Sequence, residues 1–241
     1  MSGHSKWHNI QATKNKMDAK RGKIFTKIGR EIAVAVKLGG GDPNTNNKLY
    51  DVIQKAKQNN MPNDNITRSI KKALGETGSQ NYDSITYEGY GPHGVAFIVE
   101  CLTDNRNRSA ADVRHLFDKH GGSLGTTGSV TFMFNYNSVI VVPAQDVAED
   151  DVMMVALDNG ADDVQLDGEV FVVTAGPDKL HALTKAFEAA GITVASSEVE
   201  YIPTNISELS GSAAESVQKL IDALEDLDDV QEVYTNAEFA E

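Results

Sequence analysis

The pattern of apolar and polar residues predicts three helices in the first third of the chain. From Lys20 to Leu38, apolar residues recur at helical spacing and basic residues occupy the opposite face. The GGGDP segment ends this helix, and a second helix is expected from about Asn46 to Gln58. A third follows NNMPND, with Asn63 or Asp64 as its N-cap, and runs to Gly75. Three short helices of this kind predict a small bundle.

After about residue 80 the pattern changes to alternating strands and helices. The expected elements between residues 136 and 202 follow the order βαββαβ, which is typical of a ferredoxin-like unit. They are a strand at 139–142, a helix at 150–158, a hairpin of strands 163–166 and 169–174, a helix at 177–190 and a strand at 193–200. The turn of the hairpin is assigned to Asp167 and Gly168.

The segments on either side predict a second α/β domain. They comprise strands at 84–88, 95–102 and 129–134, a helix at 109–120 capped by Ser109 and Asp112, a helix at 212–224 and a strand at 230–234. The fold class expected is therefore α+β, with a three-helix bundle and two ferredoxin-like α/β domains, one inserted into the other. The domains are residues 1–78, residues 79–135 with 203–241, and the inserted residues 136–202.

The charges divide the chain into a basic and an acidic part. The net charge is -13, yet residues 1–75 carry 15 Lys and Arg against 5 Asp and Glu. Residues 144–241 carry 3 against 23. Such an asymmetry predicts that one end attracts polyanions while the other repels them.

Composition also narrows the class of protein. No stretch approaches the ~18 apolar residues of a membrane span, so no membrane partner is expected. The basic start lacks the features of a secretory signal, and its lysines differ from the arginine and serine of a mitochondrial presequence. The single cysteine, Cys101, excludes an internal disulfide framework. A cytoplasmic protein is expected.

The sequence offers weak signals for catalysis or metal binding. His4 and His8 are four residues apart but lack a third ligand, and the Asp pairs at 150–151, 162–163 and 228–229 are interpreted as a solvated acidic face. Cys101 lies in an apolar run, where an inert thiol is usual. The GGSLGTTGS segment precedes a strand and is interpreted as a helix end and turn. No enzyme activity, metal or cofactor is predicted.

The basic helices give the clearest functional signal. A charge run alone more often marks a solvated face, but +10 on residues 1–75 of an acidic chain predicts contact with nucleic acid phosphates. Trp7 would stack on a base or dock against the bundle. The expected contact residues are Lys6, Trp7, Lys14, Lys16, Lys20, Arg21, Lys23, Lys27, Arg30, Lys37, Lys55, Arg68 and Lys72.

A smaller basic surface is expected at Arg106, Arg108 and Arg114. Arg106 and Arg108 lie at a strand-to-helix junction, where phosphate would meet both guanidinium groups and helix N–H groups. Local pairing with Asp104 and Asp112 is the alternative.

Many segments in order resemble the YebC family over essentially the whole chain. They include GHSKWHNI, DAKRGKIFTKIGREI, GGGDP, NNMP, YEGYGP, TDNRNR, VRHLF and GGSLGTTGSV. The resemblance implies a helical bundle with two α/β domains, a cytoplasmic location, and neither cofactor nor catalytic site. Members are described as probable transcriptional regulators that bind DNA, and as ribosome-associated factors that relieve stalling at proline runs. Mitochondrial relatives are translational activators of a cytochrome oxidase subunit.

The sequence therefore predicts a non-enzymatic nucleic-acid-binding regulator of gene expression, a DNA-binding transcriptional regulator of the YebC type. One alternative is a ribosome-associated translation factor that binds ribosomal RNA, because lysines read charge and not base sequence. Another is an acidic interaction module whose α/β domains bind a protein partner.

Overall fold

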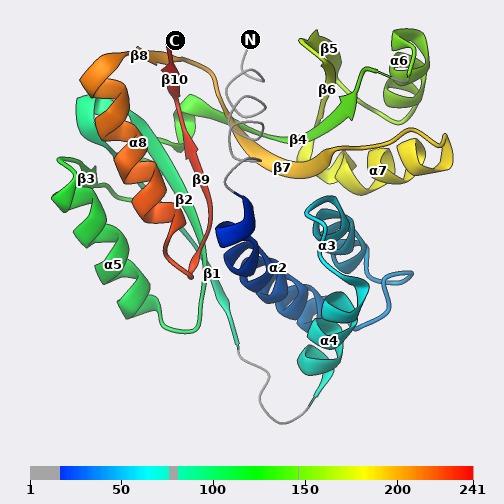
Figure 1. Cartoon of the computed structure of the whole chain (residues 1–241), viewed down its shortest axis with the longest axis horizontal. Coiled ribbons are helices and arrows are strands. Elements are labelled where there is room, and N and C mark those ends of the chain that lie inside the picture. Colours follow the sequence, from blue (N-terminus) through cyan, green and yellow to red (C-terminus); the bar gives the residue numbers. More distant parts are fainter. Residues whose placement is uncertain (1–16, 76–80, 146, 241) are drawn as a thin grey trace.

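The computed structural model describes residues 17–75, 81–145 and 147–240, and its fold class is α+β (Figure 1). Three helices come first and are called the N-terminal helices: α2 (Met17–Gly39), α3 (Asn47–Gln58) and α4 (Asn63–Leu74). Their apolar faces meet in one cluster that includes Ile28, Ile32 and Leu49. The helices expected from the apolar spacing are thus confirmed, within three residues at each end.

The ends of these helices depend on side chains that the spacing alone does not reveal. Asn46 is buried and caps α3 by accepting a hydrogen bond from the Leu49 N–H at 3.1 Å. Its amide also donates to the carbonyls of Ala35 and Gly40, both at 2.8 Å, which ties the end of α2 to the start of α3. The predicted cap of α4 was wrong, because Pro62 occupies the N-cap position and Asn63 is already helical.

The first sheet has the strand order β3-β1-β2-β9 and is antiparallel. Its strands are β3 (Ser123–Leu124), β1 (Asp83–Tyr90), β2 (Ala96–Thr103) and β9 (Val230–Thr235). Helices α5 (Arg106–Lys119) and α8 (Gly211–Glu225) cover one face, where Phe97 and Phe117 meet edge to face. A short parallel pair, β8 (Ser207–Leu209) and β10 (Ala237–Phe239), lies nearby.

The second sheet has the strand order β5-β6-β4-β7, with every pairing antiparallel. Its elements follow the predicted βαββαβ order: β4 (Phe134–Pro143), α6 (Glu149–Asp158), β5 (Asp163–Asp167), β6 (Val170–Ala175), α7 (Leu180–Ala189) and β7 (Ser196–Pro203). A short 3-10 turn, η3 (Pro177–Lys179), leads into α7. Gly168 adopts a positive φ of 59° in the β5–β6 turn, as the predicted hairpin requires.

Two local predictions in the first sheet were wrong. Residues 129–134 were expected to form a strand, but Thr131–Met133 is a 3-10 turn, η2, and β4 begins only at Phe134. Helix α5 begins at Arg106 and its cap is Asn105, which accepts a hydrogen bond from the Arg108 N–H at 3.1 Å. Ser109 was the expected cap, and it is instead buried against the body of the protein.

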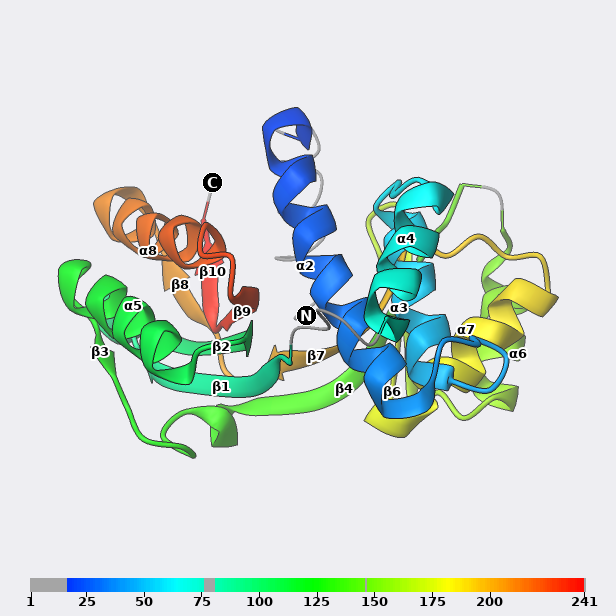
Figure 2. The ribbon, with the colours of Figure 1, turned by 90° about the horizontal axis from the view of Figure 1, so that it is seen from below.

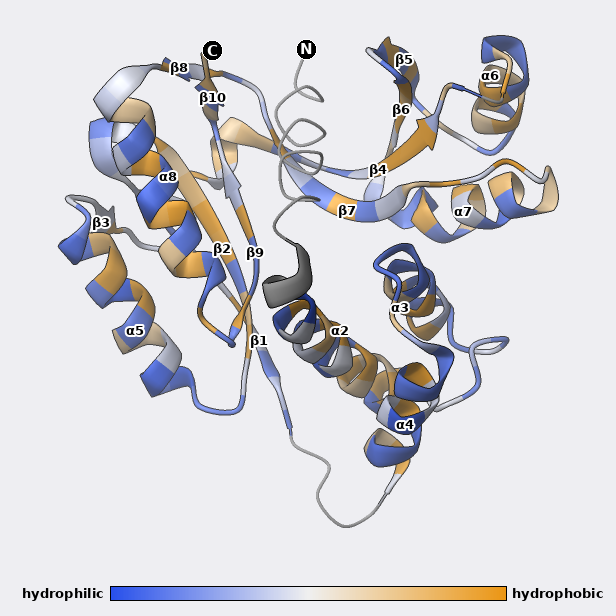
Figure 3. Ribbon diagram, viewed as in Figure 1, coloured by the Kyte–Doolittle hydropathy of each residue, from blue (hydrophilic) through white to orange (hydrophobic). Residues whose placement is uncertain are grey.

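The three parts are arranged around α2. Figure 2 shows α2 in the centre, with α5 and α8 to one side, α3 and α4 to the other, and the long strands β4 and β7 crossing beneath. Colour by hydropathy shows the apolar length of β2 inside the first sheet and the mixed faces of the helices around it (Figure 3). Helix α2 therefore has two kinds of neighbour: its own bundle and the edge of the first sheet.

Candidate nucleic-acid interface

The basic face of α2 contacts the end of α8 and the start of β9. Lys23 Nζ lies 2.8 Å from Asp226 Oδ1, and Lys27 Nζ donates to the Glu225 carbonyl at 2.9 Å. Arg30 donates to the Leu102 carbonyl at 2.8 Å. Three of the predicted contact residues are therefore engaged inside the molecule in this structure.

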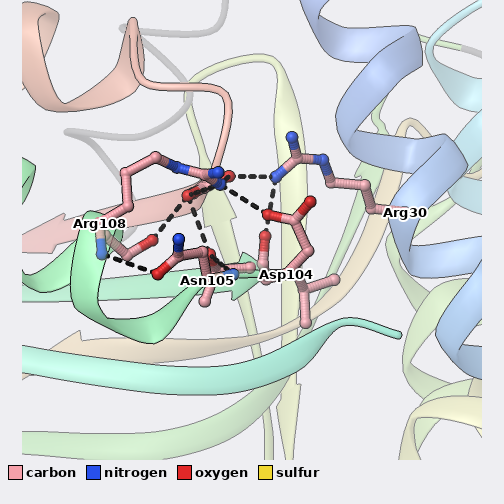
Figure 4. Close-up of polar contacts among 8 residues, drawn as sticks. Arg30, Asp104, Asn105 and Arg108 are labelled. Carbon is pink, nitrogen blue, oxygen red and sulfur yellow. Dashed lines mark hydrogen bonds and ion pairs between the residues drawn. The ribbon is translucent and has the colours of Figure 1, made fainter. Parts of the chain in front are cut away.

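Asp229 is the centre of this contact. It is 8% exposed and accepts hydrogen bonds from Arg30 at 2.6 Å and Arg108 at 2.8 Å. Thr103 Oγ1 and Ser109 Oγ donate to Oδ2, the oxygen that Arg108 also contacts at 2.8 Å, at 2.9 and 2.7 Å. Figure 4 shows Arg30 from α2 and Arg108 from α5 pointing toward each other, with Asp104 and Asn105 beside them. Arg30 and Arg108 thus join two helices through one buried acid.

The hydrogen bonds to Asp229 determine its charge. Burial alone would raise the pKa of this carboxyl, but the bonds from Arg108, Arg30, Ser109 and Thr103 outweigh burial and lower the pKa well below its usual range. Asp229 is therefore ionised at neutral pH. The earlier interpretation of residues 228–229 as a solvated acidic face was wrong for Asp229 and right for Asp228, which is exposed.

Lys55 lies where all three parts of the protein meet. Its ammonium group is within 3.0 Å of Glu31 on α2, 3.3 Å of Glu198 on β7 and 3.3 Å of Glu232 on β9. Burial would lower the pKa of Lys55, but these carboxylates outweigh burial and raise it well above its usual value. Lys55 was predicted as a nucleic-acid contact, and the structure places it in this buried junction.

The junction holds more acid than base. Burial and the nearby Glu232 raise the pKa of Glu100 to about 7. Burial also raises the pKa of Glu31, although Lys55 opposes the shift. Burial likewise lowers the pKa of Lys27, against the pull of Glu232 and Glu225. This cluster could not be predicted from the sequence, because its members are far apart along the chain.

The exposed cations of the N-terminal helices that have no partner among the described residues lie on α3, at Lys48 and Lys57, and on α4. Arg68, Lys71 and Lys72 are exposed, and their side chains make no hydrogen bond or ion pair with any residue that the structure describes. Positions 68, 71 and 72 share one side of the helix, opposite Ile66, Ile70 and Ala73, which pack in the bundle. This set is called the α4 stripe. Lys71 was missed by the sequence prediction, although its spacing from Arg68 would have identified it.

The remaining predicted residues of the N-terminal third are more varied. Arg21 is exposed near the start of α2, and Lys37 contacts the side chain of Asn81. Lys20 lies in the first turns of α2, with its side chain outside the described part of the chain. Lys6, Trp7, Lys14 and Lys16 also lie outside the described residues, as do His4 and His8.

The second predicted surface divides in the structure. Arg106 pairs with Asp83 at 2.8 Å, and Arg108 pairs with Asp104 at 2.7 Å as well as with Asp229. Arg114 is exposed on α5, with no ion pair within the described ranges. The local pairing weighed as the alternative is therefore present at Arg108 with Asp104, and at Arg106 with a different aspartate.

The backbone N–H groups at the end of the glycine-rich GGSLGTTGS segment bind the carboxylate of Glu88. Glu88 is 4% exposed and accepts hydrogen bonds from the N–H groups of Gly128 at 2.7 Å, Val130 at 2.9 Å and Thr131 at 2.9 Å. These are the backbone groups that a bound phosphate would use. The bonds that Glu88 makes here also explain why residues 131–133 turn and do not continue as a strand.

Replacing Glu88 with glutamine is expected to lower the free energy of unfolding by about 1–3 kcal/mol, because a neutral amide accepts these N–H groups less well. Burial would raise the pKa of Glu88, but the hydrogen bonds lower it, so its stabilising effect is present at neutral pH and lost as acid protonates it. Urea denaturation at pH 7 measures the difference. Glu208→Gln, at an exposed position, is the control. An equal change in both variants would contradict the role of Glu88.

Other chemistry in the described part of the chain is limited. Cys101 is buried, and burial raises the pKa of its thiol to about 12, as expected of an inert cysteine. Within the described ranges, His, Cys, Asp and Glu side chains form no group of three able to hold a metal ion. Likewise, none of the described helices combines the length and the apolar character needed to cross a membrane.

Two family models match the chain. The TACO1/YebC protein N-terminal domain matches residues 5–76, and the TACO1/YebC second and third domain matches residues 82–237. A solved structure of a conserved hypothetical protein from Aquifex aeolicus is similar, with a TM-score of 0.81 and 42% identity over 93% of each chain.

Curated relatives match over the full length. A "Probable transcriptional regulatory protein" of Clostridium botulinum (strain Eklund 17B / Type B) is 59% identical, covering 100% of this chain and 98% of the relative. A protein of the same name from Acetivibrio thermocellus is 56% identical and covers 98% of each. These names agree with the prediction of a regulatory protein that is not an enzyme. On the family models and these identities, the chain belongs to the TACO1/YebC family.

Proposed function

We propose that the protein regulates gene expression by binding DNA in the cytoplasm, through the α4 stripe and the basic residues that precede α2. The observation that carries this proposal is the location of the exposed cations. Arg68, Lys71 and Lys72 face solvent on one helix, whereas Lys23 and Arg30 of α2 are paired with carboxylates and Lys27 donates to a carbonyl. The names of the relatives, which describe transcriptional regulation, support DNA as the target.

We also propose a separate role for each domain. Residues 1–78 would carry the nucleic-acid contact, while residues 79–135 with 203–241 and the inserted residues 136–202 form the two α/β domains. The segment after Pro143 is strongly acidic, so phosphate is repelled there within the ~8–10 Å over which salt leaves charges unscreened. This acidic part would face away from DNA and be open to a protein partner.

Reversing the α4 stripe tests the proposal. The triple variant Arg68→Glu, Lys71→Glu, Lys72→Glu is expected to lower affinity for a short duplex DNA at least tenfold at low salt. The slope of log K against log salt should also become shallower by about 3, because each lost phosphate contact removes roughly one counterion. Fluorescence anisotropy over a range of salt concentrations measures both quantities.

The α/β domains supply a matched control. Lys119→Glu, Lys179→Glu and Lys219→Glu together change the net charge by the same amount, at exposed positions outside the N-terminal helices. This variant should bind nearly as well as the wild type. Equal losses in the two triples would mean that only net charge matters, and the α4 stripe would not be the contact.

A second candidate target is ribosomal RNA. The α4 stripe presents lysine and arginine, which recognise phosphate in either nucleic acid without reading base edges. Sedimentation of a lysate through a gradient separates the two targets. Comigration with ribosomal particles that the α4 triple variant abolishes would favour RNA, and migration free of ribosomes would favour DNA.

A further inference from the structure

The contact between α2 and the first sheet is made of charges and hydrogen bonds. On α2 the groups are Lys23, Lys27 and Arg30. Opposite them is an acidic corner, defined here as residues Glu225, Asp226 and Asp229 at the end of α8 and the start of β9. The corner offers the carboxylates of Asp226 and Asp229 and the carbonyl of Glu225, at 2.6–2.9 Å from the cations. Each α2 cation thus meets an oxygen acceptor, as it would on a phosphate backbone.

The apolar cores of the two sides are separate. The cluster around Ile28, Ile32 and Leu49 draws all its members, buried and partly buried, from residues 24–73. The cluster of the first sheet, which includes Phe97 and Leu224, draws its members from residues 87–239. Among the described residues, therefore, no buried apolar cluster joins the N-terminal helices to the sheets. An interface of this kind depends on electrostatics and is weakened by salt or by a competing ion.

The ion pairs Lys23–Asp226 and Arg30–Asp229 differ in how much they stabilise the contact between α2 and the acidic corner. Lys23 and Asp226 are largely exposed, with 45% and 68% of their side chains accessible, so their pair contributes little stability. Arg30 and Asp229 are 15% and 10% accessible, and separating them requires a new partner for each. Asp229 keeps Arg108, Thr103 and Ser109 when Arg30 leaves. Arg30 needs an anion, and a polyanion offers a dense row of them.

We propose that the basic face of α2 is a second, concealed phosphate-binding surface, which the acidic corner occupies until duplex DNA displaces it. This inference rests on the proposed function and adds a step to it. The exposed α4 stripe makes the first contact. DNA carries one charge per ~1.7 Å of its axis, so the same duplex then competes with Asp226 and Asp229 for Lys23, Lys27 and Arg30. The N-terminal helices swing away from the first sheet as this exchange proceeds.

The junction at Lys55 does not prevent this movement. Glu31 is on α2 and travels with Lys55. Glu198 is on β7 of the second sheet, where Asp51–His181 and Gln58–Ser197 contacts also hold α3, so the movement separates Lys55 only from Glu232 on β9. Buried ion pairs contribute little net stability, because desolvation offsets most of their attraction. Lys55 therefore helps to select the arrangement in which the N-terminal helices contact the first sheet, but it adds little to the free energy of that contact.

A covalent lock across the contact tests the proposal. In the double variant Lys23→Cys, Asp226→Cys, a short bis-maleimide joins α2 to the acidic corner, while Cys101 is buried and does not react. The control is the same double variant with each new cysteine blocked by N-ethylmaleimide. Anisotropy with a short duplex DNA of random sequence, measured against salt, compares the locked and blocked proteins.

The locked protein is expected to bind roughly tenfold more weakly at low salt, with a slope shallower by about 2, because Lys27 and Arg30 no longer reach phosphate. Equal affinities and slopes would overturn the concealed surface while leaving the α4 contact intact. Absence of binding by both proteins and by the wild type would overturn the proposed function and this inference together.

Discussion

Replacing Asp229 with alanine is expected to lower the free energy of unfolding by about 3–5 kcal/mol, among the largest effects of any single substitution in this protein. The change leaves the guanidinium of Arg30 largely buried without its anion, and it removes the acceptor for Thr103 and Ser109. Thermal and urea unfolding at pH 7 measure the loss.

Asp228 provides the control for this experiment. It is the neighbouring residue, has the same chemistry and is exposed, so Asp228→Ala should change stability by less than about 0.5 kcal/mol. The pH dependence gives a second check. Because the pKa of Asp229 is lowered by folding, its contribution is present above the usual pKa of a carboxyl group and falls away in acid. The difference between wild type and Asp229→Ala should therefore shrink at low pH. A constant difference would contradict this account.

Replacing Lys55 with methionine is expected to cost about 3–5 kcal/mol at pH 7, because Glu31, Glu198 and Glu232 then share a buried site without their common cation. Acid should rescue this variant. Glu100 already has its pKa raised to about 7 and Glu31 is raised as well, so protonation of these groups removes repulsion. For a group whose pKa is raised by folding, stability is present at low pH and is lost as the pH rises through the folded pKa.

The expected result is thus a variant whose unfolding midpoint rises on going from pH 8 to about pH 5, and rises more than that of the wild type. Lys57→Met is the control, because Lys57 is two residues away on α3 and exposed. If Lys55→Met and Lys57→Met respond alike to pH, the junction does not depend on Lys55.

Much of the fold was predictable because local sequence patterns determine most of its helices and strands. The apolar spacing of α2 and α3 and the order of strands in the second sheet follow from periodicity and turn residues. Two of the errors occurred where a distant side chain determines the local structure. Residues 129–134 look like a strand, but Glu88, about 40 positions earlier, takes the N–H groups of Val130 and Thr131. Ser109 resembles a cap, but Asp229 binds it.

The sequence was enough to predict which residues of the candidate site are basic, but not which of them face solvent. The sequence shows which residues of α2 are basic, and helical spacing places Lys23, Lys27 and Arg30 away from the bundle core. It cannot show that the end of α8, some 200 residues later, covers them. Arg68, Lys72 and Arg30 were all predicted as nucleic-acid contacts. Only the tertiary contacts show that the α4 stripe is exposed whereas Arg30 is paired with Asp229.

The strands β4 and β7 have a consequence for how this protein can vary. Phe134 and Pro203 are cross-strand partners, so the chain leaves the first sheet and returns to it at adjacent positions. Residues 134–203 therefore behave like a loop whose two ends are held together. The entropic cost of closing such a loop grows only slowly with its length. Insertions in loops of the second sheet that face away from α3 would therefore leave this pairing intact. The faces of α7 and β7 that contact α3 are constrained, because His181 pairs with Asp51 and Glu198 pairs with Lys55.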